Sequence, residues 1–179
     1  VAVGVSPNGR NINLGCGSID TDMAVKKVLE TGADLGLCLD GDGDRVTLID
    51  EKGIVATGDQ LMAVLARDWL FKGRLAKKEI VSTIMSNIGL ERYLDELGIN
   101  LIRTAVGDKY VVQKMREEGC NLGGEQSGHI VATDFATTGD GLIAGLQICA
   151  ALVGSNGRAS ELFKTYKPVP QRTINAKFD

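Results

Sequence analysis

Apolar residues follow two alternating patterns along the chain. Short continuous apolar runs, which are typical of buried strands, occur at residues 1–5, 35–39, 79–85, 99–105 and 129–135. Apolar residues with helical spacing occur at residues 22–31, 60–71, 90–97, 108–118, 141–153 and 159–166. This alternation predicts an α/β fold in which mixed sheets are flanked by helices.

Turn and capping residues divide these segments. Glycines follow the predicted helices at positions 32, 98 and 119, and Asp59 stands where an N-cap would begin the helix at 60–71. The stretch "RVTLID" at 45–50 alternates like one half of a hairpin and leads into the turn "EKG". Pro168 and Pro170 mark a linker. We therefore expect two α/β units, residues 1–56 and 57–167, followed by a linker at residues 168–179.

Composition and charge exclude several classes of partner. The 179 residues include 20 Lys and Arg against 23 Asp and Glu, so no global positive field draws the protein onto nucleic acid or an anionic membrane. The longest apolar run, at 142–153, is interrupted and is too short to span a bilayer. The four cysteines form no C-x-x-C pair. We expect free thiols, no zinc site and a reducing, cytoplasmic location.

Three aspartates at alternate positions follow the apolar run at 35–39, in "LCLDGDGDRV". Asp40, Asp42 and Asp44 would repel one another in a partly buried loop that held no counter-charge. Gly41 and Gly43 permit the tight turn that lets alternate carboxylates converge. Hard oxygen ligands are those that Mg²⁺ and Ca²⁺ prefer. The pattern therefore predicts a divalent metal site, with a solvated acidic turn as the alternative.

Two other classes of protein contain a similar pattern of aspartates. An EF-hand also has acidic residues at loop positions 1, 3 and 5, but it needs glycine where this chain has Arg45, and helices where strands are predicted. A phosphatase of the haloacid-dehalogenase type places D-x-D after an apolar strand and would use Asp40 as its nucleophile. It expects an apolar or small residue after the second Asp-Gly, where this chain has Asp44 and Arg45. The phosphatase remains the runner-up.

A second polar loop, "LGGEQSGHI" at 122–130, combines three glycines with functional side chains. Glu125 and Ser127 are two residues apart, and a carboxylate with a hydroxyl suits vicinal sugar hydroxyls, which both donate and accept hydrogen bonds. His129 is the only histidine of the chain. The loop predicts a sugar-binding site.

Together these stretches resemble the α-D-phosphohexomutase family. The matches occur in family order and comprise "PNGRNIN..CGS" (7–18), "ADLGLCLDGDGDRV" (33–46), "MSNIGL" (85–90), "TAVGDKYV" (104–111), "GGEQSGHI" (123–130) and "TTGDGLIAGLQ" (137–147). The "DGDGDR" and "GEQSG" motifs mark the superfamily. The "MSN", "VGDKYV" and "PNG" details favour its glucosamine branch over the glucose and mannose branches.

The resemblance implies a four-domain enzyme. Residues 1–56 would be the C-terminal part of domain 2, residues 57–167 domain 3, and residues 168–179 the linker to domain 4. Such an enzyme passes a phosphoryl group from a phosphoserine to a phosphorylated hexosamine and back through a bisphosphate, here interconverting glucosamine 6-phosphate and glucosamine 1-phosphate for cell-wall precursor synthesis. No residue of this chain matches the phosphoserine motif, so we expect the chain alone to be inactive. A phosphoglucomutase or phosphomannomutase is the alternative.

The resemblance also implies roles for the acidic stretch. Asp40, Asp42 and Asp44 would hold Mg²⁺, which would also touch the phosphoserine. Arg45, next in the motif, would steady the transferring phosphoryl group as a catalytic residue. Phosphoryl transfer depends mostly on positioning and on neutralising charge, which such a site can supply.

The second loop would bind the substrate. By resemblance, Glu125 and Ser127 bind sugar hydroxyls, and His129 lies beside them as a catalytic residue. Lys109 stands where the glucosamine branch commonly has Arg, so it keeps the positive charge of a phosphate-binding residue but loses the planar fork.

The predicted strand at residues 1–5 bears on whether the chain associates with itself. The sequence opens on Val1 within the predicted strand 1–5, which would leave a sheet with an unpaired edge. Unpaired edges form hydrogen bonds with other chains. We therefore expect the chain to self-associate through that edge.

Overall fold

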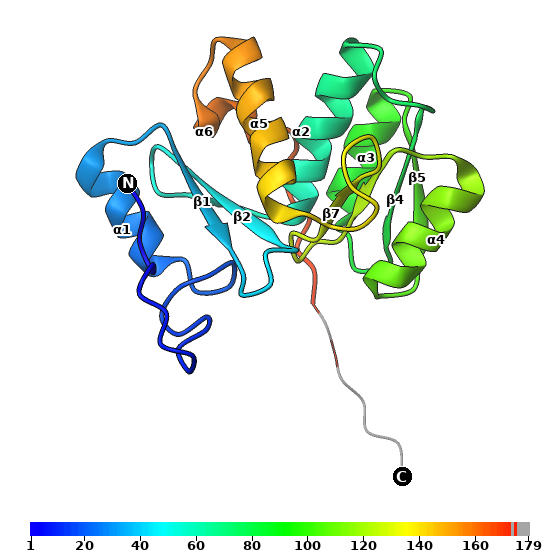
Figure 1. Cartoon of the computed structure of the whole chain (residues 1–179). Coiled ribbons are helices and arrows are strands. Elements are labelled where there is room, and N and C mark those ends of the chain that lie inside the picture. Colours follow the sequence, from blue (N-terminus) through cyan, green and yellow to red (C-terminus); the bar gives the residue numbers. More distant parts are fainter. Residues whose placement is uncertain (173, 175–179) are drawn as a thin grey trace.

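The computed structural model describes residues 1–172 and 174, and it contains two sheets joined by helices (Figure 1). Helix α1 (Asp22–Thr31) precedes an antiparallel sheet of β1 (Leu35–Leu39), β2 (Val46–Asp50) and β3 (Val55–Ala56), in that order. After α2 (Gly58–Phe71), the second sheet has the order β5-β4-β6-β7. The expected α/β fold with helices flanking mixed sheets is confirmed.

The second sheet is mixed. Strand β4 (Glu79–Thr83) pairs in parallel with both β5 (Asn100–Thr104) and β6 (Leu122–Gly124), whereas β7 (Ile130–Ala132) pairs antiparallel with β6. The remaining helices are α3 (Ile88–Glu96), α4 (Asp108–Glu118), α5 (Gly141–Ser155) and α6 (Ala159–Leu162). Helix α4 packs on β4 and β6, and α3 packs on β5 and α2. Helices therefore cover both faces of this sheet.

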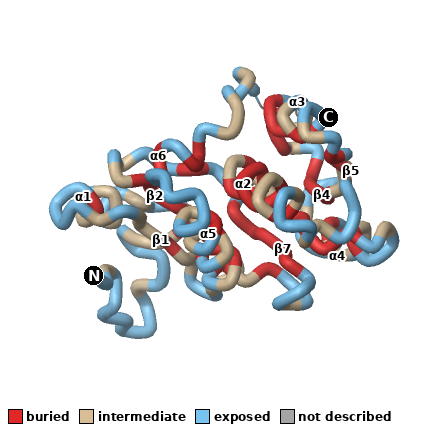
Figure 2. Tube along the Cα trace, turned by 90° about the horizontal axis from the view of Figure 1, so that it is seen from above, coloured by how far each residue is buried: buried red, intermediate tan, exposed pale blue. Residues whose placement is uncertain are grey.

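Helix α5 joins the two sheets. It contacts β1 and β2 of the first sheet, β7 of the second, and α2. A Cβ atom at Gly145 would lie 2.4 Å from Cδ1 of Leu37, so the missing side chain lets β1 approach the helix. The largest apolar cluster runs from Val46 and Leu48 through α2, including Trp69, to α5, and Figure 2 shows the buried residues along α2 and β7. One continuous core thus fixes the two sheets relative to each other.

The structure corrects two expectations about local elements. Residues 1–5 form no strand, because none of the described strands pairs with them, and Val1 is 98% exposed. The N-cap of α2 is Thr57, not Asp59: the Thr57 hydroxyl accepts from the backbone of Gln60, whose side chain accepts from the backbone of Thr57. This capping box satisfies the first free N–H groups of the helix, and Asp59 is buried in its first turn.

Other boundaries differ by a few residues or not at all. Helices α1 and α4 have the predicted bounds, and α6 ends at Leu162 rather than at residue 166. All four cysteines are free, as expected. Among the described residues, no helix has the length and apolar character needed to cross a bilayer. Residues 173 and 175–179 of the predicted linker lie outside the described residues.

Candidate active site

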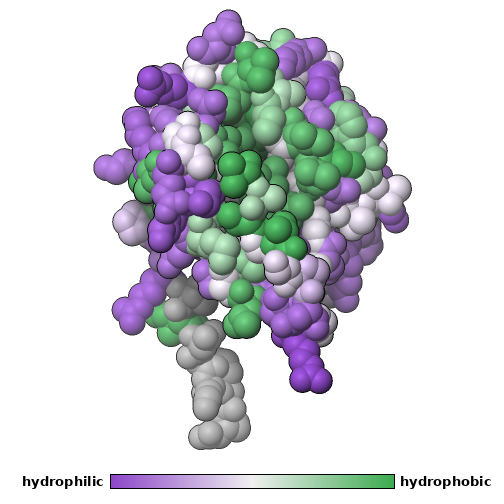
Figure 3. Space-filling view, turned by 60° about the vertical axis from the view of Figure 1, so that its left-hand side comes forward, coloured by the Kyte–Doolittle hydropathy of each residue, from purple (hydrophilic) through white to green (hydrophobic). Residues whose placement is uncertain are grey.

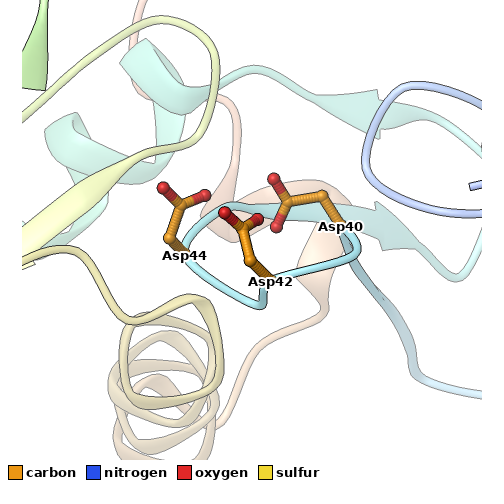
Figure 4. Close-up of side chains that lie close together, drawn as sticks. All are labelled: Asp40, Asp42 and Asp44. Carbon is orange, nitrogen blue, oxygen red and sulfur yellow. The ribbon is translucent and has the colours of Figure 1, made fainter. Parts of the chain in front are cut away.

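The three aspartates lie in the loop that connects β1 to β2, which we call the acidic loop (residues 40–45). Their carboxylates project from the same side of the loop (Figure 4), and one oxygen of each lies within 4.8 Å of the others. The backbone N–H of Gly43 donates to the carbonyl of Asp40 over 3.2 Å, with a φ of 73° at Gly43. Because side chains disfavour this conformation, glycine is what permits the turn that gathers the carboxylates.

The protein itself compensates this charge weakly. The Nε atom of Arg45 lies 3.8 Å from Oδ1 of Asp44 and 3.9 Å from Oδ2 of Asp40, which is too far for a hydrogen bond. The Oδ1 atom of Asp44 is buried without a hydrogen-bond partner among the described residues. Burial raises the pKa of Asp44, His129 acts to lower it, and the charges of Asp40 and Asp42 raise it further. Three converging carboxylates with an unpartnered buried oxygen fit an oxygen-seeking cation such as Mg²⁺.

The elements on either side of the acidic loop exclude one alternative. Strand β1 precedes the loop and strand β2 follows it, and the two strands pair antiparallel from Leu39 with Val46 to Leu35 with Asp50. An EF-hand requires a helix on each side. The acidic loop is therefore the turn of a hairpin and not an EF-hand.

The second loop (residues 125–129) connects β6 to β7 and packs against backbone of other elements. The N–H of Gly58, at the start of α2, donates to the carbonyl of Gln126 over 3.1 Å, and the N–H of Val46 donates to the carbonyl of Gly128 over 3.1 Å. A Cβ atom at Gly128 would lie 2.2 Å from the carbonyl oxygen of Val46. The glycine therefore permits a backbone contact that fixes the loop on β2.

The two loops meet at His129. Its Nδ1 atom lies 3.1 Å from Oδ2 of Asp44, and Arg45 pairs with His129 in an isolated antiparallel bridge. Because a carboxylate accepts hydrogen bonds, Nδ1 carries the proton in this contact. His129 is 2% exposed, and its Nε2 is buried without a partner among the described residues. The metal-binding and sugar-binding candidates thus form one site.

The predicted substrate-binding residues lie at different distances from this contact. An Oε1 atom of Glu125 accepts from the backbone N–H of Gly107 over 3.0 Å, which brings the turn before α4 to the second loop. Lys109, two residues further on, is exposed, and its Nζ lies 4.7 Å from the centre of the Tyr110 ring. Ser127 is exposed at the tip of the second loop. The structure therefore brings Glu125 and the segment of Lys109 together and leaves both Ser127 and Lys109 open to solvent.

Sequence reasoning missed the glycines that allow these close approaches. A Cβ atom at Gly139 would lie 2.4 Å from Nε2 of His129, so the ring packs directly on that backbone. A Cβ atom at Gly58 would lie 2.3 Å from the carbonyl oxygen of Glu125. Each of these glycines comes just before or at the start of a helix, in "TTGDG" and "TGDQ", and that position is the signal that could have identified them.

Comparison with known proteins identifies relatives of the whole chain. The family model described as phosphoglucomutase/phosphomannomutase, alpha/beta/alpha domain III, matches residues 57–169. A phosphoglucosamine mutase of Roseobacter denitrificans is 58% identical over 178 residues, and that of Paracoccus denitrificans is 59% identical over 178 residues. Each match covers 99% of this chain and 40% of the relative. The chain thus spans about 40% of the length of these curated relatives.

Solved structures have the same fold. A phosphoglucomutase/phosphomannomutase family protein of Burkholderia thailandensis matches with a TM-score of 0.76 and 26% identity, over 85% of this chain and 33% of the other. An N-acetylphosphoglucosamine mutase of Aspergillus fumigatus, solved in complex with GlcNAc-6P and magnesium, matches with a TM-score of 0.72 and 20% identity, over 92% of this chain and 42% of the other.

Proposed function

Because this chain belongs to the phosphoglucomutase/phosphomannomutase family, we propose that it is the metal-binding and sugar-binding part of a phosphoglucosamine mutase. The activity would be an isomerisation, the interconversion of glucosamine 6-phosphate and glucosamine 1-phosphate in amino-sugar and cell-wall precursor synthesis. The names of the relatives that are 58–59% identical favour the glucosamine substrate over glucose or mannose phosphates. The single observation that carries the proposal is the Asp44–His129 contact, since it makes one site of the two loops.

The proposed domain limits follow the organisation of the fold. Residues 1–56, which contain the antiparallel sheet, are the C-terminal part of domain 2, and residues 57–167 are domain 3. The family match at 57–169 supports a boundary near Thr57. Residues from 168 onward are the linker to domain 4.

In the proposed mechanism, Asp40, Asp42 and Asp44 hold Mg²⁺ through their carboxylates. A bound Mg²⁺ supplies charge stabilisation to the oxygens of a transferring phosphoryl group. Arg45 adds a guanidinium beside the same carboxylates and so contributes positive charge at the transfer site. His129 donates from Nδ1 to Asp44 and fixes the orientation of that carboxylate.

The second loop orients the sugar in this proposal. The Glu125 carboxylate accepts hydrogen bonds from sugar hydroxyls, and the Ser127 hydroxyl both donates to them and accepts from them. The N–H of Gly107 donates to the Glu125 carboxylate and holds it in place. The exposed Lys109 attracts the substrate phosphate as a point charge. The chain has no serine in the family's phosphoserine motif, and we propose that alone it binds ligand without mutase activity. A phosphatase with Asp40 as nucleophile is not favoured, because the relatives are mutases.

Titration of the purified chain tests this function. Glucosamine 6-phosphate, glucose 6-phosphate and mannose 6-phosphate are titrated with and without Mg²⁺ while the backbone amides of residues 40–45 and 125–129 are followed by NMR. We expect Mg²⁺ to shift the acidic loop and glucosamine 6-phosphate to shift the second loop most. Asp42→Asn should abolish the response to Mg²⁺, and Asp95→Asn, an exposed control on α3, should not. Shifts caused by neither ligand would refute the proposal.

We also propose that the chain self-associates through β1 and resides in the cytoplasm. Within the part of the chain that the structure describes, strand β1 pairs with β2 along one edge and with no strand along the other. A hollow of about 380 Å³ lies beside it, lined by residues 1–4 and by the apolar side chains of Met23, Leu37 and Leu39. Figure 3 shows apolar side chains gathered on a face of the molecule, and Leu142 and Leu146 of α5 are exposed. Sedimentation over a range of concentrations would show a monomer throughout if the self-association proposal is wrong.

A further inference from the structure

A chain of close oxygen contacts runs from Asp59 to the strand that leads into the second loop. The Oδ1 atom of Asp59 lies 2.8 Å from Oγ of Ser86, which lies 2.6 Å from Oγ of Ser82, which lies 2.7 Å from the carbonyl oxygen of Gly124. Asp59 and Ser82 are 0% exposed and Ser86 is 3% exposed. Gly124 directly precedes Glu125. We call these four groups the hydroxyl relay.

The number of protons available in the hydroxyl relay determines whether Asp59 is protonated or ionised. The carbonyl of Gly124 can only accept, so the single hydroxyl proton of Ser82 is directed at it. Ser82 Oγ must then accept from Ser86, which uses the single proton of Ser86. The contact between Ser86 and Asp59 therefore needs a proton from Asp59. With an ionised Asp59, two hydroxyl protons would serve three contacts, and one buried pair of oxygens would face each other without a hydrogen.

We propose that Asp59 is a neutral carboxylic acid in the folded chain and donates its proton through Ser86 and Ser82 to the carbonyl of Gly124. Asp59 is then a positioning residue for the second loop, and that role rests on the proposed function of the loop. The other carboxyl oxygen, Oδ2, accepts from the backbone N–H of Asn87 over 2.7 Å. A neutral carboxylic acid satisfies both contacts, one as donor and one as acceptor.

The groups that face Asp59 are consistent with this state. Burial raises the pKa of Asp59, and the N–H of Asn87, the contact with Ser86 and the charge of Arg103 act in the opposite direction. Arg103, on β5, is paired with Glu91 of α3 through bonds of 2.8 and 3.2 Å, so its charge is shared. Tyr166, from the C-terminal segment, is an uncharged phenol at neutral pH, and burial raises its pKa further. The N-terminus of α2 favours a carboxylate, but it adds no proton to the hydroxyl relay.

A direct measurement needs no variant. Aspartate carboxyl carbons are labelled with ¹³C in the whole chain, and the pH is varied while Asp59 is followed by NMR. We expect Asp59 to remain protonated to a higher pH than the exposed aspartates of the same chain. Ionisation of Asp59 together with those aspartates, or below them, would overturn the proposal.

Three variants test the donor role of Asp59. Asp59→Asn can donate from its amide nitrogen to Ser86 and accept from Asn87, as the neutral acid does, whereas Asp59→Ala can do neither. At a pH below 3.8, where Asp59 is protonated in both the folded and the unfolded chain, we expect the unfolding equilibrium constant to stay within about threefold of wild type for Asp59→Asn and to rise at least about tenfold for Asp59→Ala. The Asn variant should also become more stable relative to wild type as pH rises above 3.8, because a group with a raised pKa loses its stabilising contribution with rising pH. Equal damage from both variants would contradict the proposal.

Ser86→Ala separates positioning from stability. It should move the carbonyl ¹³C signal of Gly124 and the amide ¹⁵N signal of Glu125, while Asp59→Asn leaves both near wild type. Unchanged signals in a folded Ser86→Ala chain would overturn the positioning role. If Asp59 ionises normally but sugar phosphate binds, only this inference fails. If Asp59 stays protonated but no ligand binds, only the proposed function fails.

Discussion

The Nδ1 atom of His129 lies 3.1 Å from Oδ2 of Asp44, although the two residues are 85 positions apart in the sequence. Asp44 belongs to the turn of an antiparallel hairpin, and His129 directly precedes β7 of the other sheet. The N–H of Gly141 also donates to the carbonyl of Gly43 over 2.8 Å. The geometry of the candidate metal ligands therefore depends on elements from both sheets.

Replacing His129 should weaken metal binding. In His129→Ala, the Asp44 carboxylate loses the donor that orients it, and partners of this kind typically contribute 10–100-fold in affinity. We expect the dissociation constant for Mg²⁺, measured by calorimetry, to rise about tenfold or more. His129→Asn, which can place an amide N–H near the position of Nδ1, should recover part of the loss. An unchanged affinity in His129→Ala would contradict the orienting role.

Replacing Asp42 should change the stability of the metal-free chain little, and it should remove the stability that wild type gains from Mg²⁺. Without Mg²⁺, Asp42→Asn relieves repulsion at an exposed position, so the free energy of unfolding should change by no more than about 0.5 kcal/mol. With Mg²⁺ at about 100 times the dissociation constant, wild type should gain about 2.7 kcal/mol and the variant nothing. Urea unfolding with and without Mg²⁺ measures both values. A matching gain in the variant would exclude Asp42 as a ligand.

A methyl group at Gly58 should displace the second loop. The added Cβ would lie 2.3 Å from the carbonyl oxygen of Glu125 and 2.7 Å from the nitrogen of Gly128, and both are backbone atoms that cannot rotate away. We expect Gly58→Ala to lower the free energy of unfolding by about 1–3 kcal/mol. Gly154→Ala, on the exposed end of α5, should instead raise it by about 0.5 kcal/mol. Equal effects would mean that the close approach at Gly58 is not a constraint.

Local features of this chain could be predicted from sequence, and features that need a partner could not. The bounds of α4 agree with the prediction, and the end of the helix follows from Gly119, which adopts a left-handed C-cap. Residues 1–5 have the composition of a strand, but a strand forms only where another strand accepts its hydrogen bonds. Asp59 reads as an N-cap, yet Thr57 takes that role through its box with Gln60.

The candidate site likewise combines a local feature that the sequence predicts with a contact that depends on packing. The convergence of Asp40, Asp42 and Asp44 follows from alternating aspartates and glycines within six residues, so the sequence alone predicts it. The contact between Asp44 and His129 depends on how α5 and β7 pack on the hairpin, and no local pattern encodes it. Family resemblance placed both loops in one enzyme without saying which atoms touch.

The contact between Glu51 and Ser160 should make stability depend on acid. Glu51 follows β2, and its carboxylate accepts from the hydroxyl of Ser160 and, over 3.0 Å, from the Ser160 backbone N–H. The Ser160 hydroxyl is the main reason that the pKa of Glu51 lies below its ordinary value of 4.5. A lowered pKa contributes stability that is present above pH 4.5 and is lost as pH falls through the folded-state pKa.

Ser160→Ala should therefore lower the free energy of unfolding at neutral pH by about 1.5–3 kcal/mol, because a hydrogen bond to a charged group is lost. The difference from wild type should shrink as pH falls below 4.5, since a protonated Glu51 gains less from the hydroxyl. Fluorescence of the single tryptophan, Trp69, during urea unfolding at several pH values measures the difference. Ser155→Ala, at the exposed end of α5, is the control and should show no such trend. A difference that stays constant with pH would mean that the hydroxyl stabilises α6 without acting on the Glu51 charge.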